Sequence, residues 1–330
     1  MKLVKRNGLF IRDIEDQTEE LCLAALNEDR GAIRYIKNPT EEMCMMAVRT
    51  NKGRYLKYIE NQTEEMCYEA VRYNCPKNLE YAKIQSDRVC LKAIRQEPYV
   101  LEFVLNQTEE MCLEAVKQEG RALKYVKNQT KEICLIAFDN FIYALKYVKE
   151  QTEELCATAV TINGLALRYV DDQTEEICWA AVRQNGQALE FVKNQTEEMC
   201  LEAVRKDGHT LKHVKNRTYE ICSEAVKQNG YALTYIKDQT EELCIEAVMK
   251  DGLALKYVKD QTEEICVEAV KVHVDALSKV TNQTERVCLA AIEAHGCVAV
   301  FFQIEDIELA GRMRSCSEGK RFMRTKSAKK

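Results

Sequence analysis

The sequence predicts an all-α fold, an α-solenoid of about 13 two-helix repeats of 22–23 residues. Three observations lead to this prediction. A threonine recurs every 22 residues from Thr108 to Thr284, the apolar residues after it follow the spacing of one helix face, and a glycine stands at a constant place further on. Self-similarity at such a period is typical of arrays in which each repeat packs only on its neighbours.

The first helix of each repeat is predicted to begin at the threonine. After Thr108, the apolar residues Met111, Cys112, Ala115 and Val116 lie three, four, seven and eight places on. The threonine oxygen is a good N-cap, and the two glutamates that follow it suit the positive end of the helix dipole. We therefore expect a helix of about ten residues.

A glycine is predicted to end this first helix. Ten of the twelve glycines share one place, at positions 8, 31, 53, 120, 164, 186, 208, 230, 252 and 296. We expect positive φ there, because such a turn often closes a helix at its C-terminus. Ala122, Leu123, Tyr125 and Val126 then form a second apolar face, which predicts a second helix of roughly seven or eight residues.

The domain organisation is predicted to be one array over residues 1–310, with a partial repeat at 1–17 and a closing helix at 298–310. Residues 311–330 hold eight Lys or Arg against Glu318 alone, so this tail has a net charge of +7. The whole chain has a net charge of −5, and residues 1–310 therefore carry −12. We expect the tail to be disordered.

No apolar run approaches the roughly 18 residues of a membrane span, and we find no signal-peptide core, so we expect neither membrane insertion nor secretion.

The repeat also resembles a known type. Glu-Glu-Ile/Met-Cys-Leu-Glu-Ala-Val-Lys-Gln-Asn-Gly alternates with Ala-Leu-Lys-Tyr-Val-Lys, most clearly from Thr218 to Lys259. This pattern is similar to the short helical repeats of unknown function that are expanded in giant viruses of amoebae (mimivirus-like). The resemblance covers about residues 1–304 and transfers no catalytic residue. It implies a viral protein of the host cytoplasm or the virion, and it implies no activity.

Thirteen cysteines, from Cys22 to Cys288, each lie four places after the capping residue. A metal or redox ladder is one interpretation. Stacked helices lie about 8–10 Å apart, however, which exceeds the Cα separation of about 4.4–6.8 Å in a disulfide. We therefore favour cysteine as a small apolar packing residue. We likewise interpret triplets such as Asn106-Gln107-Thr108 as helix caps rather than glycosylation sites, and we expect no metal and no cofactor.

Two further rows run along the predicted second helices. An aromatic residue recurs from Tyr35 to Tyr257, with His213 substituting once, and could stack bases or pack between repeats; we favour packing. Lysine or arginine recurs beside it, for example at Lys124 and Lys127. This basic row could follow a phosphate backbone, but acids alternate with it throughout, so we favour a solvated face or ion pairs between repeats.

The most variable place follows the glycine and is our candidate partner-binding surface. It holds Arg121, Tyr143, Leu165, Gln187, His209, Tyr231 and Leu253. Unconstrained drift at an exposed place would give the same variability. His209 and His213 share a helix face as a conceivable metal pair, but no second ligand group has the matching spacing.

The sequence favours a non-enzymatic scaffold that mediates protein–protein interaction. We find no phosphate loop or nucleophile elbow, so we expect no enzyme. The alternative is nucleic-acid binding through the basic row and the tail, with candidate contacts Arg312, Arg314, Lys320, Arg321 and Arg324. A further alternative is a self-associating structural or virion component that pairs through its N-terminal end, where we identify no polar cap.

Overall fold

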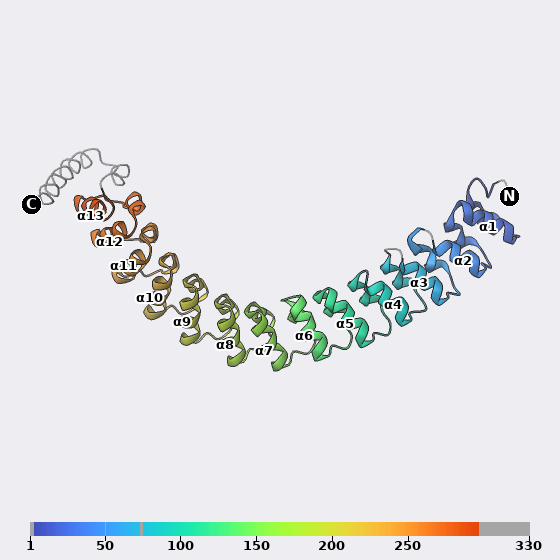
Figure 1. The fold of residues 1–330 in the computed structure, drawn as a ribbon, viewed down its shortest axis with the longest axis horizontal. Coiled ribbons are helices and arrows are strands. Elements are labelled where there is room, and N and C mark those ends of the chain that lie inside the picture. Colours follow the sequence, from blue (N-terminus) through green and yellow to red (C-terminus); the bar gives the residue numbers. More distant parts are fainter. Residues whose placement is uncertain (1–2, 50, 73–74, 297–330) are drawn as a thin grey trace, which may run out of the picture. The chain divides into compact units, whose positions relative to one another are not determined.

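The computed structural model describes residues 3–49, 51–72 and 75–296, where every regular element is a helix (Figure 1). Thirteen α-helices alternate there with thirteen 3₁₀ helices, which confirms the α-solenoid of helical repeats. The α-helices are α1 (Glu19–Glu28), α2 (Glu41–Val48), α3 (Glu64–Arg72), α4 (Asp87–Ile94), α5 (Glu109–Gln118), α6 (Lys131–Asn140), α7 (Glu153–Ile162), α8 (Glu175–Gln184), α9 (Glu197–Lys206), α10 (Tyr219–Gln228), α11 (Glu241–Lys250), α12 (Glu263–Val272) and α13 (Glu285–His295). The 3₁₀ helices are η1 (Gly8–Asp13), η2 (Arg30–Tyr35), η3 (Asn51–Tyr58), η4 (Pro76–Tyr81), η5 (Pro98–Phe103), η6 (Gly120–Tyr125), η7 (Ala144–Tyr147), η8 (Gly164–Tyr169), η9 (Gly186–Phe191), η10 (Gly208–His213), η11 (Gly230–Tyr235), η12 (Gly252–Tyr257) and η13 (Val274–Lys279).

The described residues form two compact units. The first runs to Ile162 and includes Tyr169–Asp171, and the second holds Asn163–Arg168 and the residues from Asp172 onward. Within each unit, successive α-helices lie side by side in chain order, as Figure 1 shows. The predicted closing helix at 298–310 and the basic tail at 311–330 lie outside the described residues.

The threonines cap the α-helices as predicted. The Thr174 hydroxyl oxygen, for example, accepts a hydrogen bond from the backbone N–H of Ile177 at 3.4 Å. In several repeats the same hydroxyl also donates to a glutamate of the preceding repeat, as Thr262 does to Glu241 at 2.6 Å. Ser86 departs from this pattern, because its hydroxyl caps no helix N–H and instead donates to Glu64 at 2.6 Å.

The second helix of the repeat is not the α-helix that the sequence predicted. It is a 3₁₀ helix, in most repeats of six residues, such as η6. It starts directly after the α-helix, where Glu119 adopts extended dihedrals and its side chain accepts the N–H of Arg121. It stops at Val126, which is also extended and whose N–H bonds back to Leu123. So short a segment forms few i→i+4 bonds, and 3₁₀ geometry is common in pieces of this length.

The predicted apolar faces form the core. Met111, Cys112, Ala115 and Val116 of α5 are each at most 3% exposed. Ala122, Leu123 and Val126 of the following η6 segment are each 0% exposed. Because a single helical pair buries too little to hold itself together, these faces are stabilised by packing on the next repeat.

The glycine has a different role from the predicted one. Among the glycines of the described residues, Gly53 and Gly296 alone have positive φ. The other glycines begin or enter the 3₁₀ helices and, apart from Gly31, lie against the α-helix of the next repeat. A Cβ on Gly230 would lie 2.4 Å from the carbonyl oxygen of Ala247, and one on Gly252 would lie 2.4 Å from that of Ala269. Glycine is therefore required for close approach of two backbones rather than for a left-handed turn.

In most repeats a glutamine directly before the capping threonine joins the repeat to the next, while Pro39 and Arg217 stand at this place before Thr40 and Thr218. The amide nitrogen of Gln195 donates to the carbonyl oxygens of Leu189 in its own repeat, at 3.0 Å, and of His213 in the next, at 2.9 Å. Its oxygen accepts the backbone N–H of Lys215 at 2.9 Å. The bridge to the next repeat recurs at Gln17, Gln62, Gln85, Gln107, Gln129, Gln151, Gln173, Gln239 and Gln261. We call this arrangement the glutamine clamp.

The glutamine clamp explains how the short 3₁₀ helices end. The last carbonyl groups of a helix have no partner within it and must find one elsewhere. The clamp amide donates two hydrogen bonds to such carbonyls. Its oxygen accepts one from the backbone N–H two residues after the end of the next 3₁₀ helix. A glutamate lacks the donors, and we expect an asparagine to be too short to reach both repeats.

A second contact ties the other end of the repeat. The side chain of Asn140 accepts the N–H of Gly120 at 3.0 Å and donates to the carbonyl oxygen of Lys117 at 2.8 Å. Gln184 and Gln228 accept the N–H of Gly164 and Gly208 in the same way, at 2.6 and 2.7 Å. Amide side chains therefore bridge consecutive repeats at both ends.

Replacing a repeat glycine with alanine should destabilise the array according to the clearance available. Gly230→Ala would place its Cβ 2.4 Å from Ala247 O, and we expect a loss of about 1–3 kcal/mol in the free energy of unfolding. The matched control is Gly186→Ala, whose Cβ would lie 3.1 Å from Ala203 O and should cost less. Urea unfolding measures both; equal effects would contradict the backbone-approach explanation.

Truncating a clamp should weaken one interface between repeats. Gln195→Ala removes the bonds to Leu189, His213 and Lys215, and at about 0.5–1.5 kcal/mol for each bond we expect a loss of roughly 2–3 kcal/mol. Denaturant unfolding followed by circular dichroism would measure it. As a control, Gln187→Ala alters an amide that bridges no backbone between repeats, and a loss as large as that of Gln195→Ala would argue against the clamp.

Candidate interaction surfaces

One aromatic residue lies at the end of each 3₁₀ helix from η2 to η12. We call the residues Tyr35, Tyr58, Tyr81, Phe103, Tyr125, Tyr147, Tyr169, Phe191, His213, Tyr235 and Tyr257 the ladder row. Most are half-buried, while Tyr58 and Tyr81 are 41% and 37% exposed. The carbonyl oxygen of a ladder residue is the one that the glutamine clamp holds, as at Tyr125. The row is therefore fixed in place by the backbone beneath it.

The candidate partner-binding residues lie beside the ladder row. We call Arg121, Tyr143, Leu165, Gln187, His209, Tyr231 and Leu253 the variable row, and each occupies the place after the glycine position. Several contact the ladder residue of the next repeat. The ring of Tyr231 meets that of Tyr257 edge to face at 5.7 Å, and His209 meets Tyr235 at 6.2 Å.

Other members of the variable row make the same kind of contact with different chemistry. Tyr143 packs edge to face on Tyr169 at 5.9 Å. The Gln187 oxygen lies 3.1 Å from Nε2 of His213. Tyr99, which the sequence comparison of repeats missed because a proline replaces the glycine before it, packs on Tyr125 at 6.2 Å. The variable row is thus half-buried in most repeats and joins the ladder row in one surface within each unit.

Cations cover the rings of this surface. The guanidinium of Arg34 lies over both Tyr35 and Tyr58, at 5.2 and 5.7 Å from the ring centroids. Lys57 likewise lies over Tyr58 and Tyr81 at 5.1 and 5.7 Å. Such contacts are favourable, and they occupy ring faces on which a base would have to stack. The packing interpretation of the aromatics is therefore better supported than base stacking.

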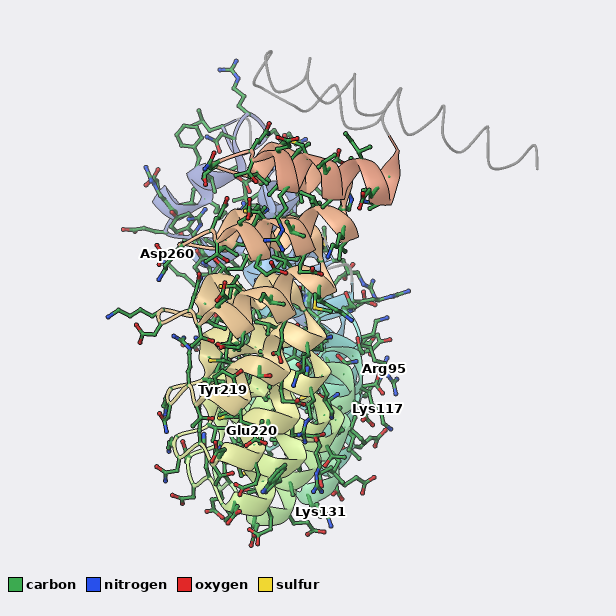
Figure 2. All side chains as sticks on the ribbon, turned by 90° about the vertical axis from the view of Figure 1, so that its left-hand side faces the viewer. Arg95, Lys117, Lys131, Tyr219, Glu220 and Asp260 are labelled. Carbon is green, nitrogen blue, oxygen red and sulfur yellow. The ribbon has the colours of Figure 1, made fainter. Side chains whose placement is uncertain are left out.

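Part of the predicted basic row has a structural role. The ammonium group of Lys127 donates to the carbonyl oxygen of Leu105 at 2.7 Å, and Lys259 donates to that of Lys237 at 2.6 Å. Ion pairs between repeats also form on the α-helices, such as Arg205 with Glu224 at 2.9 Å. Arg95 and Lys117 lie along one edge of the first unit (Figure 2). The candidate nucleic-acid contacts Arg312, Arg314, Lys320, Arg321 and Arg324 lie outside the described residues.

The repeated cysteines are packed inside the array. All thirteen are at most 5% exposed. In several repeats the thiol donates weakly to the oxygen of the clamp glutamine, as Cys67 does to Gln62 at 3.3 Å. Burial raises the pKa of the Cys112, Cys200 and Cys244 thiols to about 11. These thiols therefore act as small packing residues that are poor nucleophiles near neutral pH.

The histidine pair is also engaged within the protein. His209 packs on Tyr235, and His213 contacts Gln187; burial lowers the pKa of His213. Across residues 3–49, 51–72 and 75–296, no group of three or more His, Cys, Asp or Glu side chains is arranged to hold a metal ion. In the same ranges we find no helix long and apolar enough to cross a membrane.

Shallow grooves lie between the segment around the clamp position of one repeat and the same segment of the next repeat. One groove of ≈ 470 Å³ is lined by Gln107, Glu109, Lys127 and neighbouring residues, and one of ≈ 350 Å³ by Arg217, Tyr219, Lys237 and their neighbours. The first has the ordinary residues of the repeat. In the second, Arg217 stands where most repeats have the clamp glutamine, and Tyr219 stands where most have the first glutamate.

Comparison with known proteins agrees with the repeat structure. Residues 152–195 and 196–239 each match the family model described as a domain of unknown function, DUF4116. Each match begins at a capping threonine and ends at a clamp glutamine, so it covers two of the repeats described above. No curated protein matches the chain. The chain is therefore a helical repeat protein in which two adjacent segments are similar to a domain of unknown function.

The buried thiols should resist alkylation in the folded protein. At pH 8 a thiol with a pKa of about 11 is ionised in roughly one molecule in a thousand, so Cys112, Cys200 and Cys244 should remain unmodified by iodoacetamide until denaturant is added. Peptide mass spectrometry would read the modification site by site. Because the folded pKa exceeds the unfolded value, this contribution to stability is present below pH 9 and is lost as the pH rises towards 11. Rapid labelling of the native protein would contradict the packing role.

Proposed function

We propose that the chain is a non-enzymatic scaffold that binds protein partners through the ladder and variable rows. The observation that carries the proposal is the contrast within each repeat. The residues that hold the array together recur with little change, whereas the adjoining variable row changes from Arg121 to Tyr143, Leu165 and Gln187 in successive repeats. A fixed frame that presents different side chains at regular intervals is how repeat proteins form extended binding surfaces.

The chemistry of this surface supports protein binding. Half-buried tyrosines with nearby cations, such as Tyr231 and Tyr257 with Lys256 at 5.3 and 4.6 Å from their ring centroids, are enriched at protein interfaces. Among the described residues, the thirteen repeated cysteines pack inside and the capping threonine hydroxyls accept helix N–H groups, so both recurrent side chains have structural roles. The resemblance to giant-virus repeats supports a viral protein that acts in the host cytoplasm or the virion.

Site-specific photocrosslinking tests this proposal. A photoreactive phenylalanine at Leu253, in the variable row, should crosslink to one or a few proteins in a lysate of the host cells. The matched control places the same group at Met249, which is 58% exposed on α11. With a partner so identified and purified, Leu253→Ala should weaken binding at least fivefold and Met249→Ala should not. No position-dependent crosslink, or equal weakening by both variants, would contradict the proposal.

The second candidate function is nucleic-acid binding. The alternation of Arg34 and Lys57 with exposed tyrosines in the first unit favours it, since cations at regular intervals can follow a phosphate backbone. Salt-sensitive binding of RNA or DNA that is lost on deleting residues 312–330 would support it.

Self-association through the N-terminal end is a further alternative, since Leu3 and Phe10 are 63% and 42% exposed there. Sedimentation of a Phe10→Ser variant would test it.

A further inference from the structure

Arg217 changes the glutamine clamp in one repeat. Its guanidinium keeps the contact within its own repeat, donating to the carbonyl oxygen of Leu211 at 3.2 Å, and it adds a bond to that of Lys212 at 3.3 Å. It does not reach the next repeat. The hydrogen bond of the clamp within its own repeat is therefore formed, and the two hydrogen bonds that would cross to the next repeat are not.

Two backbone groups are left open as a result. In the repeats that have the glutamine, the clamp holds the carbonyl oxygen of the ladder residue and the N–H two residues later, as Gln195 does for His213 and Lys215. The corresponding groups here are the carbonyl oxygen of Tyr235 and the N–H of Lys237, and no hydrogen bond from the described residues reaches either of them. A backbone acceptor and a backbone donor are thus left open on either side of Ile236, which lines the groove together with Lys237.

The charged side chains around this groove are mainly cationic. Lys215, Arg217 and Lys237 line it, with Asp238 as the only acid among the lining residues of the described structure. The ordinary groove at Gln107 has one cation, Lys127, and one acid, Glu109. The local charge is therefore reversed relative to the rest of an acidic array.

An exposed aromatic ring completes the groove. Tyr219 stands at the first position of α10, where most repeats have glutamate, and it is 55% exposed (Figure 2). An exposed tyrosine offers a large apolar area with a polar tip at little cost in conformational entropy. Two substitutions in one repeat thus change both the charge and the polarity of the same groove.

We propose that this groove binds an extended acidic segment of a partner protein. One residue of the extended segment takes the two bonds that glutamine makes in other repeats, with its backbone N–H on Tyr235 O and its backbone carbonyl on Lys237 N–H. Carboxylates of the segment pair with Arg217 and Lys237, and a side chain packs on the ring of Tyr219. This is main-chain recognition of an extended peptide with charge complementarity. It rests on the proposed scaffold function and gives that function a specific site.

The test uses the full chain and two substitutions that restore the ordinary repeat. Ten-residue peptides would be selected from a displayed random library and their binding measured by fluorescence polarisation. The selected peptides should be acidic, and Arg217→Gln and Tyr219→Glu should each weaken their binding at least tenfold. Gln107→Arg, with Glu109→Tyr in the same protein, should create a second site at the ordinary groove.

A stability measurement separates lost binding from lost folding. Because Arg217→Gln restores the clamp to Tyr235 and Lys237, it should raise the Tm by roughly 2–4 °C while it weakens binding. A variant that binds as well as the wild type, a library that yields no acidic binders, or an unchanged Tm would overturn the proposal. Crosslinking at Leu253 is independent of the groove, so its outcome distinguishes a failure of this site from a failure of the scaffold function.

Discussion

The bridge that one glutamine amide makes between consecutive repeats is the contact on which the described structure depends. Each 3₁₀ helix is too short to satisfy its own terminal carbonyl groups, and an unpaired polar group at a packed interface costs free energy. The amide of Gln195 satisfies carbonyls of two repeats and one N–H at once. Packing of Leu, Val and Ala supplies the attraction between repeats, and the amide sets the register in which they meet.

Much of the repeat could be predicted from sequence because its signals are local. A threonine before two glutamates and an apolar face at helical spacing defined the α-helix, and burial of Met111 and Ala115 confirmed that face. The 3₁₀ helix could not be distinguished from an α-helix, since four apolar residues such as Ala122 to Val126 fit either period. The clamp was missed because its partners lie about 18 and 20 residues away, and Gln107 was interpreted only as part of a cap or a glycosylation triplet.

The glycine shows how a correct pattern can be given the wrong cause. Its constant place suggested positive φ, which Gly53 has, but Gly230 is constrained by the carbonyl of Ala247 in the next repeat. That partner is 17 residues away, and no local pattern reveals it. The same reasoning applies to the variable row. Tyr231 was predicted to be either exposed to a partner or free to drift, and it instead packs edge to face on Tyr257 while remaining part of the surface.

The strongest functional signals are consequently departures from the repeat rather than the repeat itself. Arg217 and Tyr219 alter a groove whose ordinary form is visible at Gln107, so the array supplies its own reference. Native-state hydrogen exchange tests the central role of the clamp most directly. The backbone amides of Lys215 and Lys259, which bond to clamp oxygens, should be protected, whereas that of Lys237, opposite Arg217, should exchange much faster. Equal protection of the three amides would contradict the clamp as the contact that joins the repeats.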